Sequence, residues 1–351
     1  MSRVEIVGWT GTGLRGGHDV LLAVDRSYSA WLPSGRDIDG DGRIGATRKR
    51  NTPTDLGFEA HPFWTTDAGD TIYQAEVLAA GRLIERLDPS RVRMGLITFA
   101  GGGRVRAPLG STETELADAL RRLPVRGGPG TNFKIAIQRA VAEFERVATP
   151  GEVRHRSLLL LSDGFPATGK RPDGERAFVA VAARRAREAG IRIFGFAVGR
   201  AAAEHASAFK LLASNTGGEL MLIDRPADVI EHVPYLSLTR IDRVEIDNLS
   251  SSARARSVRV FPDGSFDAYA PLQPGLNILR ISVFGEDGGS RVLDRRVYFE
   301  RIPANSPTRV AEARRLLRDL KIRTIEMELA RIAREKRRRA RWRELEIQVD
   351  D

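Results

Sequence analysis

Apolar runs of five to eight residues alternate with amphipathic stretches between residues 18 and 235, and this alternation restricts the fold more than any other feature. The amphipathic stretches have helical periodicity, whereas the apolar runs are short enough to be buried strands. The expected strands cover residues 19–24, 92–99, 157–161, 191–198 and 219–223. Such alternation is typical of a mostly parallel sheet with helices on both faces. We therefore expect a Rossmann-like α/β domain over residues 18–237, preceded by an N-terminal extension of residues 1–17.

The pattern changes after this domain. Short β-like runs separated by Pro, Asp and Gly turns fill residues 238–302 without helical periodicity, which favours a small all-β sandwich. Pro303 and Pro307 then mark a break. Residues 305–351 are rich in Ala, Leu, Arg and Glu and predict a basic amphipathic C-terminal helix.

Composition excludes several classes of protein. The 351 residues include no cysteine, so disulfides, thiolate nucleophiles and cysteine-based zinc sites are ruled out. No apolar run is long enough for a transmembrane helix. The first residues lack the pattern of a signal peptide, so the expected location is cytoplasmic if this N-terminus is authentic, and the cell envelope or exterior if an export signal has been removed.

Oxygen-bearing side chains occur at three places in the sequence, either just after a predicted strand or in a loop between elements. Asp25, Ser27 and Ser29 follow the strand at 19–24 at alternating positions. Thr131 lies in a later glycine-rich loop, and Asp163 follows the strand at 157–161. The carboxyl ends of strands in open α/β sheets are common ligand sites. Because every donor is a hard oxygen, the set predicts Mg²⁺ or Ca²⁺ rather than zinc or copper.

This set resembles the metal-ion-dependent adhesion site (MIDAS) of von Willebrand factor A domains, whose pattern is Asp-x-Ser-x-Ser, then a distant Thr and a distant Asp. The resemblance implies that Ser27, Ser29 and Thr131 coordinate the metal through hydroxyl oxygens. It implies that Asp25 and Asp163 act mainly through water. The expected ion is Mg²⁺, with Mn²⁺ or Ca²⁺ as alternatives.

The resemblance also implies a function. An open coordination position on the cation would accept an Asp or Glu side chain of a protein partner, so the chain is expected to be an adhesion-type binding module and not an enzyme. The predicted β-sandwich looks like the immunoglobulin-like module that follows such domains in some bacterial proteins. Ser27 also has no histidine partner, which disfavours a serine hydrolase.

Three further residues are expected at the rim of the site, where they would contact the partner: Tyr28, Gly130 and Asn132. A small residue is more usual at the position of Tyr28. The alternative for Tyr28 is a ring that packs on the insertion that follows it. The glycines before Thr131 are expected to let the backbone approach the metal.

A long insertion at residues 30–70 contains a second candidate cation site. Asp37, Asp39 and Asp41 occupy positions 1, 3 and 5 of a calcium-loop pattern; Gly42 follows at position 6, and Arg43 would offer its carbonyl oxygen at position 7. Position 12 is Arg48 instead of an acidic residue, so Asp55, Glu59 or Asp67 would have to complete the shell. The alternative is a solvated Asp/Gly turn. Asp70 is expected to cap the helix that follows the insertion.

The C-terminal segment carries most of the charge. Residues 309–343 hold fourteen Lys or Arg and five Asp or Glu, against a net charge of +10 for the whole chain. Three alternatives are a helix docked on its own domains, a helix that binds a second protein partner, and contact with nucleic acid or an anionic membrane. The apolar stripe and the scarcity of aromatic residues favour protein over nucleic acid. The second functional hypothesis is therefore a non-enzymatic adaptor that docks on a partner such as a ring ATPase.

Overall fold

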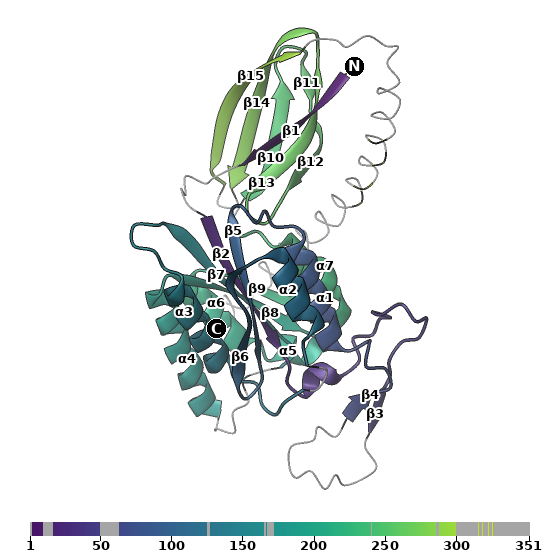
Figure 1. The fold of residues 1–351 in the computed structure, drawn as a ribbon, viewed down its shortest axis with the longest axis vertical. Coiled ribbons are helices and arrows are strands. Elements are labelled where there is room, and N and C mark those ends of the chain that lie inside the picture. Colours follow the sequence, from purple (N-terminus) through teal and green to yellow (C-terminus); the bar gives the residue numbers. More distant parts are fainter. Residues whose placement is uncertain are drawn as a thin grey trace, which may run out of the picture. The chain divides into compact units, whose positions relative to one another are not determined.

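The chain forms two compact units in the computed structural model (Figure 1). One unit spans Gly16–Pro234, and the other combines Met1–Arg15 with Tyr235–Asp351. The structure describes residues 2–9, 17–49, 63–124, 127–164, 166, 172–239, 241–285 and 288–299, together with Arg315, Arg318, Ile322 and Ile325.

The first unit is built on a six-stranded sheet with the strand order β6-β5-β2-β7-β8-β9. Its strands are β2 (Gly17–Asp25), β5 (Val92–Phe99), β6 (Gly103–Ser111), β7 (Arg154–Ser162), β8 (Ile191–Val198) and β9 (Leu220–Ile223). All pairings are parallel except that of β6 with β5. Strand β2 lies between β5 and β7. After β2 the chain continues to β5 on one side of it and later crosses to β7 on the other side, so the carboxyl end of β2 is a topological switch point.

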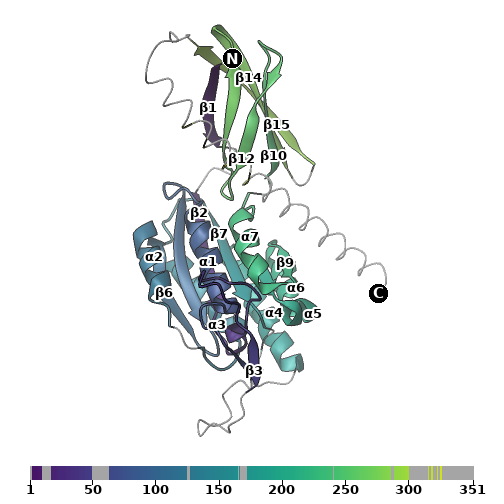
Figure 2. The ribbon, with the colours of Figure 1, turned by 90° about the vertical axis from the view of Figure 1, so that its right-hand side faces the viewer.

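Helices cover both faces of this sheet (Figures 1 and 2). The helices are α1 (Ile72–Ile84), α2 (Glu113–Arg121), α3 (Phe133–Arg146), α4 (Pro172–Glu188), α5 (Arg200–Glu204), α6 (Ser207–Thr216), η3 (Pro226–Asp228), α7 (Val229–His232) and η4 (Val233–Tyr235). Helices α1, α2 and α7 pack together on one face, and α3, α4 and α6 on the other. The predicted α/β class, with a mostly parallel sheet between two helical layers, is confirmed.

The central strand is buried on both faces, which explains its continuous apolar sequence. Residues 20–24 of β2 are each fully buried. Leu21 and Ala23 belong to the core beneath α3, α4 and α6. The parallel register places Asp25 beside Phe99 of β5, and Val24 beside Leu161 of β7. Burial and pairing thus fix the point at which the β2 chain leaves the sheet.

The insertion after β2 begins with the short helix η1 (Ser29–Trp31) and includes an antiparallel pair, β3 (Thr47–Lys49) and β4 (Phe63–Thr65). Helix η1 and the β3–β4 pair all lie at one end of the α/β unit (Figures 1 and 2). The expected capping role of Asp70 is wrong, because Thr71 is the N-cap of α1 and accepts from the Gln74 amide. Asp70 instead accepts hydrogen bonds from the Ile38 and Gly45 amides, at 2.6 and 3.0 Å. It therefore anchors the insertion loop.

The second unit consists of two antiparallel sheets, β1-β13-β12 and β11-β10-β14-β15. The strands are β1 (Ser2–Trp9), β10 (Ile241–Asn248), β11 (Ala253–Arg254), β12 (Arg256–Val260), β13 (Ser265–Leu272), β14 (Gly275–Gly285) and β15 (Ser290–Phe299). Its core joins side chains of both sheets, among them Ile246 and Leu279 from one and Phe266 and Ala268 from the other.

One strand of the second unit comes from the N-terminal extension. Ser2–Trp9 pairs along its whole length with β13, from Ser2 beside Leu272 to Trp9 beside Ser265. Residues near both ends of the described chain therefore build one sheet, and the α/β unit is inserted between them in sequence. From the sequence, residues 1–17 are expected only as an N-terminal extension.

Most of the predicted C-terminal helix at 305–351 lies outside the described residues. Within it, Arg315, Arg318, Ile322 and Ile325 are helical and exposed. Among the described residues, the structure has no helix that is both long and apolar enough to cross a membrane.

Candidate functional site

Asp25 occupies the carboxyl end of the central strand and is fully buried. Its Oδ1 accepts a hydrogen bond of 2.7 Å from the Ser27 amide, which turns the chain back over the end of the strand. Its Oδ2 accepts from the Ser162 hydroxyl at the end of the neighbouring strand β7. Asp25 therefore ties the Asp-x-Ser-x-Ser loop to the last residue of β7.

The two serine hydroxyls of this loop converge with Asp163. The Oγ atoms of Ser27 and Ser29 are 3.0 Å apart, and the Ser29 hydroxyl donates to Asp163 Oδ1 at 3.1 Å. Neighbouring oxygens in an octahedral Mg²⁺ shell with bonds of 2.0–2.1 Å also lie about 3 Å apart. These oxygens therefore have the spacing that adjacent ligands of Mg²⁺ require.

Thr131 reaches the same place on a loop that is pinned to two strand ends. Gly128 donates to the Arg26 carbonyl at 2.8 Å, and Gly101 donates to the Pro129 carbonyl at 2.7 Å. The Asn132 amide donates to the Ala100 carbonyl at 2.9 Å. These backbone bonds fix the position of Thr131, which is 4% exposed.

Gly164 leaves open space between the hydroxyls. A Cβ on Gly164 would lie 3.3 Å from Thr131 Oγ1 and 3.7 Å from Ser29 Oγ. The five predicted residues are thus brought together, with the absent side chain of Gly164 leaving room beside two of the oxygens. A hard cation of the size of Mg²⁺ fits this set of hydroxyl and carboxylate donors.

The carboxylates of the site are buried without a positive partner among the described residues. Burial raises the pKa of Asp25 to about 6, although hydrogen bonds from Ser162 and Ser27 oppose the shift. Burial raises the pKa of Asp163 well above its ordinary value, and the charge of Asp25 raises it further. A divalent cation would relieve both effects.

The three predicted rim residues have different roles in the structure. Tyr28 is partly buried and immediately precedes η1. Gly130 has a φ of +72°, which a side chain would strain. Asn132 is the N-cap of α3: its Oδ1 accepts from the Ile135 amide and its Nδ2 donates to the Gly101 carbonyl. Asn132 is thus occupied in holding the loop.

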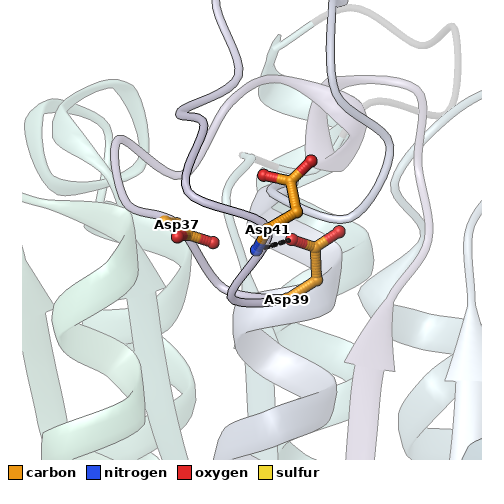
Figure 3. A group of neighbouring side chains, drawn as sticks. All are labelled: Asp37, Asp39 and Asp41. Carbon is orange, nitrogen blue, oxygen red and sulfur yellow. Dashed lines mark hydrogen bonds between the residues drawn. The ribbon is translucent and has the colours of Figure 1, made fainter.

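The second candidate site is a group of three aspartates in the insertion (Figure 3). Asp37, Asp39 and Asp41 each offer a carboxylate oxygen within 4.8 Å of the other two. Amide hydrogen bonds within the loop fold it tightly: Asp37 accepts from Gly40 and Gly42, and Asp39 accepts from Asp41. Gly42 has a φ of +84°, as the sharp turn at position 6 requires.

Other acidic side chains lie near this loop. The Asp41 amide favours the ionised form of Asp39, but partial desolvation and the nearby charges of Asp41, Asp67 and Asp70 together raise its pKa. Of the residues suggested to complete the shell, Asp67 is therefore close by, whereas Asp55 and Glu59 lie outside the described residues. Arg48, at position 12, lies in β3 and pairs with Trp64.

Two buried polar residues beside the first site, Ser162 and Glu76, had no role among the sequence-based predictions. Ser162 is fully buried and donates to Asp25, but a single serine at the end of a strand carries little signal. Glu76 is fully buried on α1. Its signal was available in the sequence, since it falls at helical spacing between the apolar residues Ile72 and Ala79.

The α/β unit has the Rossmann-like fold of a von Willebrand factor A domain, a class that generally serves as a metal-dependent protein-binding module. Residues 71–230 match the profile of the von Willebrand factor type A domain family. That match begins after the insertion, but β2 lies at the centre of the same sheet, so Asp25 belongs to the domain.

Among related proteins, matrilin-1 of Gallus gallus is 30% identical over 162 residues, which are 43% of this chain and 30% of matrilin-1. The matched region thus spans less than a third of that relative. BatB from Bacteroides thetaiotaomicron is 17% identical, with a TM-score of 0.41 over 62% of this chain and 98% of BatB. A von Willebrand factor type A protein from Catenulispora acidiphila is 13% identical, with a TM-score of 0.42 over 86% and 76% of the two chains.

Proposed function

We propose that this protein is a divalent-cation-dependent protein-binding module that captures an acidic side chain of its partner at a MIDAS metal. Ser27, Ser29 and Thr131 would hold the cation through their hydroxyl oxygens, and Asp25 and Asp163 would orient the shell. The cation would supply a positive charge with an open coordination position. We infer that the module binds its partner without turnover.

The observation that carries this proposal is the 3.0 Å spacing of the Ser27 and Ser29 hydroxyl oxygens, with Asp163 3.1 Å from Ser29. Hydroxyl ligands are neutral, so they leave most of the charge of a cation uncompensated. A carboxylate from outside is the natural ligand for such a cation, because hard cations prefer oxygen donors. Mg²⁺ is the proposed ion, with Mn²⁺ or Ca²⁺ as alternatives.

The test is binding to an array of peptides that contain one Asp or Glu, beside matched peptides with Asn or Gln. We expect the full chain to bind acidic peptides in Mg²⁺ and not in EDTA, and to ignore the amide peptides. Asp25→Ala and Thr131→Ala should abolish binding. Thr149→Ala, at an exposed position near the amino end of β7, is the matched control. Binding that persists in EDTA, or in both site variants, would remove the proposal.

We also propose Ca²⁺ for the insertion loop, with Asp37, Asp39, Asp41 and the Arg43 carbonyl as ligands. The clustered carboxylate oxygens and the nearby Asp67 support it. The test is calorimetric titration of Ca²⁺ into Asp25→Ala, in which the first site is disabled. We expect one binding event, which is lost when Asp39→Asn and Asp41→Asn are added. No uptake by Asp25→Ala would show that the loop is a solvated turn.

The adaptor hypothesis concerns the C-terminal segment. Ile322 and Ile325 are 55% and 63% exposed, in helical conformation, which favours a role in docking a second protein. It predicts that deletion of residues 305–351 abolishes association with a partner such as a ring ATPase, whereas Asp25→Ala leaves that association intact. Co-purification of the partner with each variant distinguishes this hypothesis from capture at the metal.

A further inference from the structure

Glu76 is an acidic residue in a position where the fold otherwise places apolar side chains. It lies on the buried face of α1, whose other members include Ile72, Ala79 and Leu83. The side chain is fully buried. An ionisable group is rarely buried in this way unless it is paired or has a function.

Neither carboxylate oxygen of Glu76 has a hydrogen-bond partner among the described residues. A buried carboxylate left unpaired is costly, and a leucine at this position would avoid the cost. Groups of this kind in an otherwise well-packed core are expected at functional sites. Packing alone therefore does not explain why an acidic residue occupies position 76.

The surroundings of Glu76 connect it with the metal site. Helix α1, which carries Glu76 on its buried face, packs against β2, and β2 ends at Asp25. Burial raises the pKa of Glu76 well above the ordinary value, and the charges of Asp25 and Asp163 raise it further. The Asp25 amide lies near enough to favour the ionised form, although it falls short of a full hydrogen bond. Three buried carboxylates thus gather at one end of the sheet. Among the described residues, Asp25 and Asp163 receive hydrogen bonds only from hydroxyl and amide groups.

We propose that Glu76 is a positioning residue of the cation site, a third carboxylate that the five-residue motif does not contain. It contributes negative charge near Asp25 that a divalent cation offsets, and it helps to hold the carboxyl end of β2 in place when the cation is bound. This inference rests on the proposed function, because it assumes that the site takes up a cation. Glu76 itself touches neither the partner nor a reacting atom.

The alternative is a structural role, in which Glu76 is a neutral acid that fills space beneath the loop. The two roles differ in what Glu76→Gln does, because glutamine keeps the shape and removes the charge. A space-filling role predicts unchanged cation affinity. The proposed role predicts weaker cation binding and no loss of stability in the metal-free protein, since an unpaired buried carboxylate has been removed.

The experiment is calorimetric titration of Mg²⁺ into the full chain, together with thermal unfolding in EDTA and in saturating Mg²⁺. We expect Glu76→Gln to bind Mg²⁺ about 10–100-fold more weakly than the unsubstituted protein, in the range found for residues that support metal ligands. Its Tm in EDTA should equal or exceed that of the unsubstituted protein, and the gain in Tm from Mg²⁺ should shrink. Glu85→Gln, at the C-cap of the same helix, is the matched control and should change neither quantity.

Glu76→Asp provides a second variant, which keeps the charge and shortens the side chain. Its Mg²⁺ affinity should exceed that of Glu76→Gln. The inference is overturned if Glu76→Gln binds Mg²⁺ within twofold of the unsubstituted protein, or if its Tm in EDTA falls. It is also overturned if the aspartate variant binds more weakly than the glutamine variant. Failure of the unsubstituted protein to take up any ion would instead remove the proposed function.

Discussion

At the scale of single residues, burial changes the pH at which a carboxylate of the metal-free site loses its proton. Burial raises the pKa of Asp25 from its ordinary value of 3.8 to about 6. The folded state therefore holds this proton more tightly than the unfolded state does. It follows that the free energy of unfolding falls as pH rises between these two values, and that the loss is complete above about pH 6.

We predict that the Tm measured in EDTA decreases when the pH is raised from 4 to 7, and that saturating Mg²⁺ reduces this decrease above pH 6. Asp25→Asn removes one titrating carboxylate and should flatten the profile in EDTA. The measurement is a series of thermal unfolding curves followed by circular dichroism. A Tm in EDTA that rises over this interval in the unsubstituted protein and in Asp25→Asn alike would contradict the prediction.

The candidate site could be recognised from sequence because its five oxygen-bearing residues follow a known order at predicted strand ends. What sequence could not supply is which other residues lie beside these five in the folded chain. Ser162 acts through a contact between neighbouring strands, which appears only once β2 and β7 are paired. Glu76 acts from a helix that follows a long insertion, so its distance from Asp25 along the chain hides its proximity.

At the scale of helices and strands, the local sequence pattern was sufficient to predict a strand that is buried on both faces of the sheet. Val92–Phe99 and Ile191–Val198 have the predicted bounds because each is an apolar run that only one arginine, near its start, interrupts. Strand β6 was missed because it is an antiparallel edge strand that contains Pro108 and two glycines. Strand β1 was missed because its partner β13 lies near the other end of the chain.

The pairing of β1 with β13 leads to a prediction about the N-terminus. Deleting residues 2–9 removes a strand from the three-stranded sheet and leaves the edge of β13 unpaired. We expect a loss of stability in the β unit on the order of 3 kcal/mol, from several backbone hydrogen bonds at roughly 1 kcal/mol each. Urea unfolding should show this loss, with Mg²⁺ uptake unchanged.

Mg²⁺ uptake is the control in that experiment, since the deleted strand contributes nothing to the site on β2 and β7. Equal stability of the deleted and full-length chains would show that β1 is dispensable. Loss of Mg²⁺ uptake would show that the two units depend on each other.

At the scale of the whole molecule, the α/β unit contains every residue of both candidate cation sites, whereas the β unit is assembled from the two ends of the chain. We predict that residues 16–234 fold alone and bind Mg²⁺ within about threefold of the full chain, because no ligand is lost. Calorimetry on the excised unit is the measurement. Binding weakened more than tenfold, in a unit that circular dichroism shows to be folded, would mean that the second unit supports the site.

The central claim is that Asp25, Ser27, Ser29, Thr131 and Asp163 form one cation site at the end of β2. Anomalous diffraction at the manganese edge from crystals grown with Mn²⁺ tests it most directly. The account predicts an anomalous peak within coordinating distance of the Ser27 and Ser29 hydroxyl oxygens, which disappears in crystals of Asp25→Ala. No peak between these hydroxyls at saturating Mn²⁺ would contradict it.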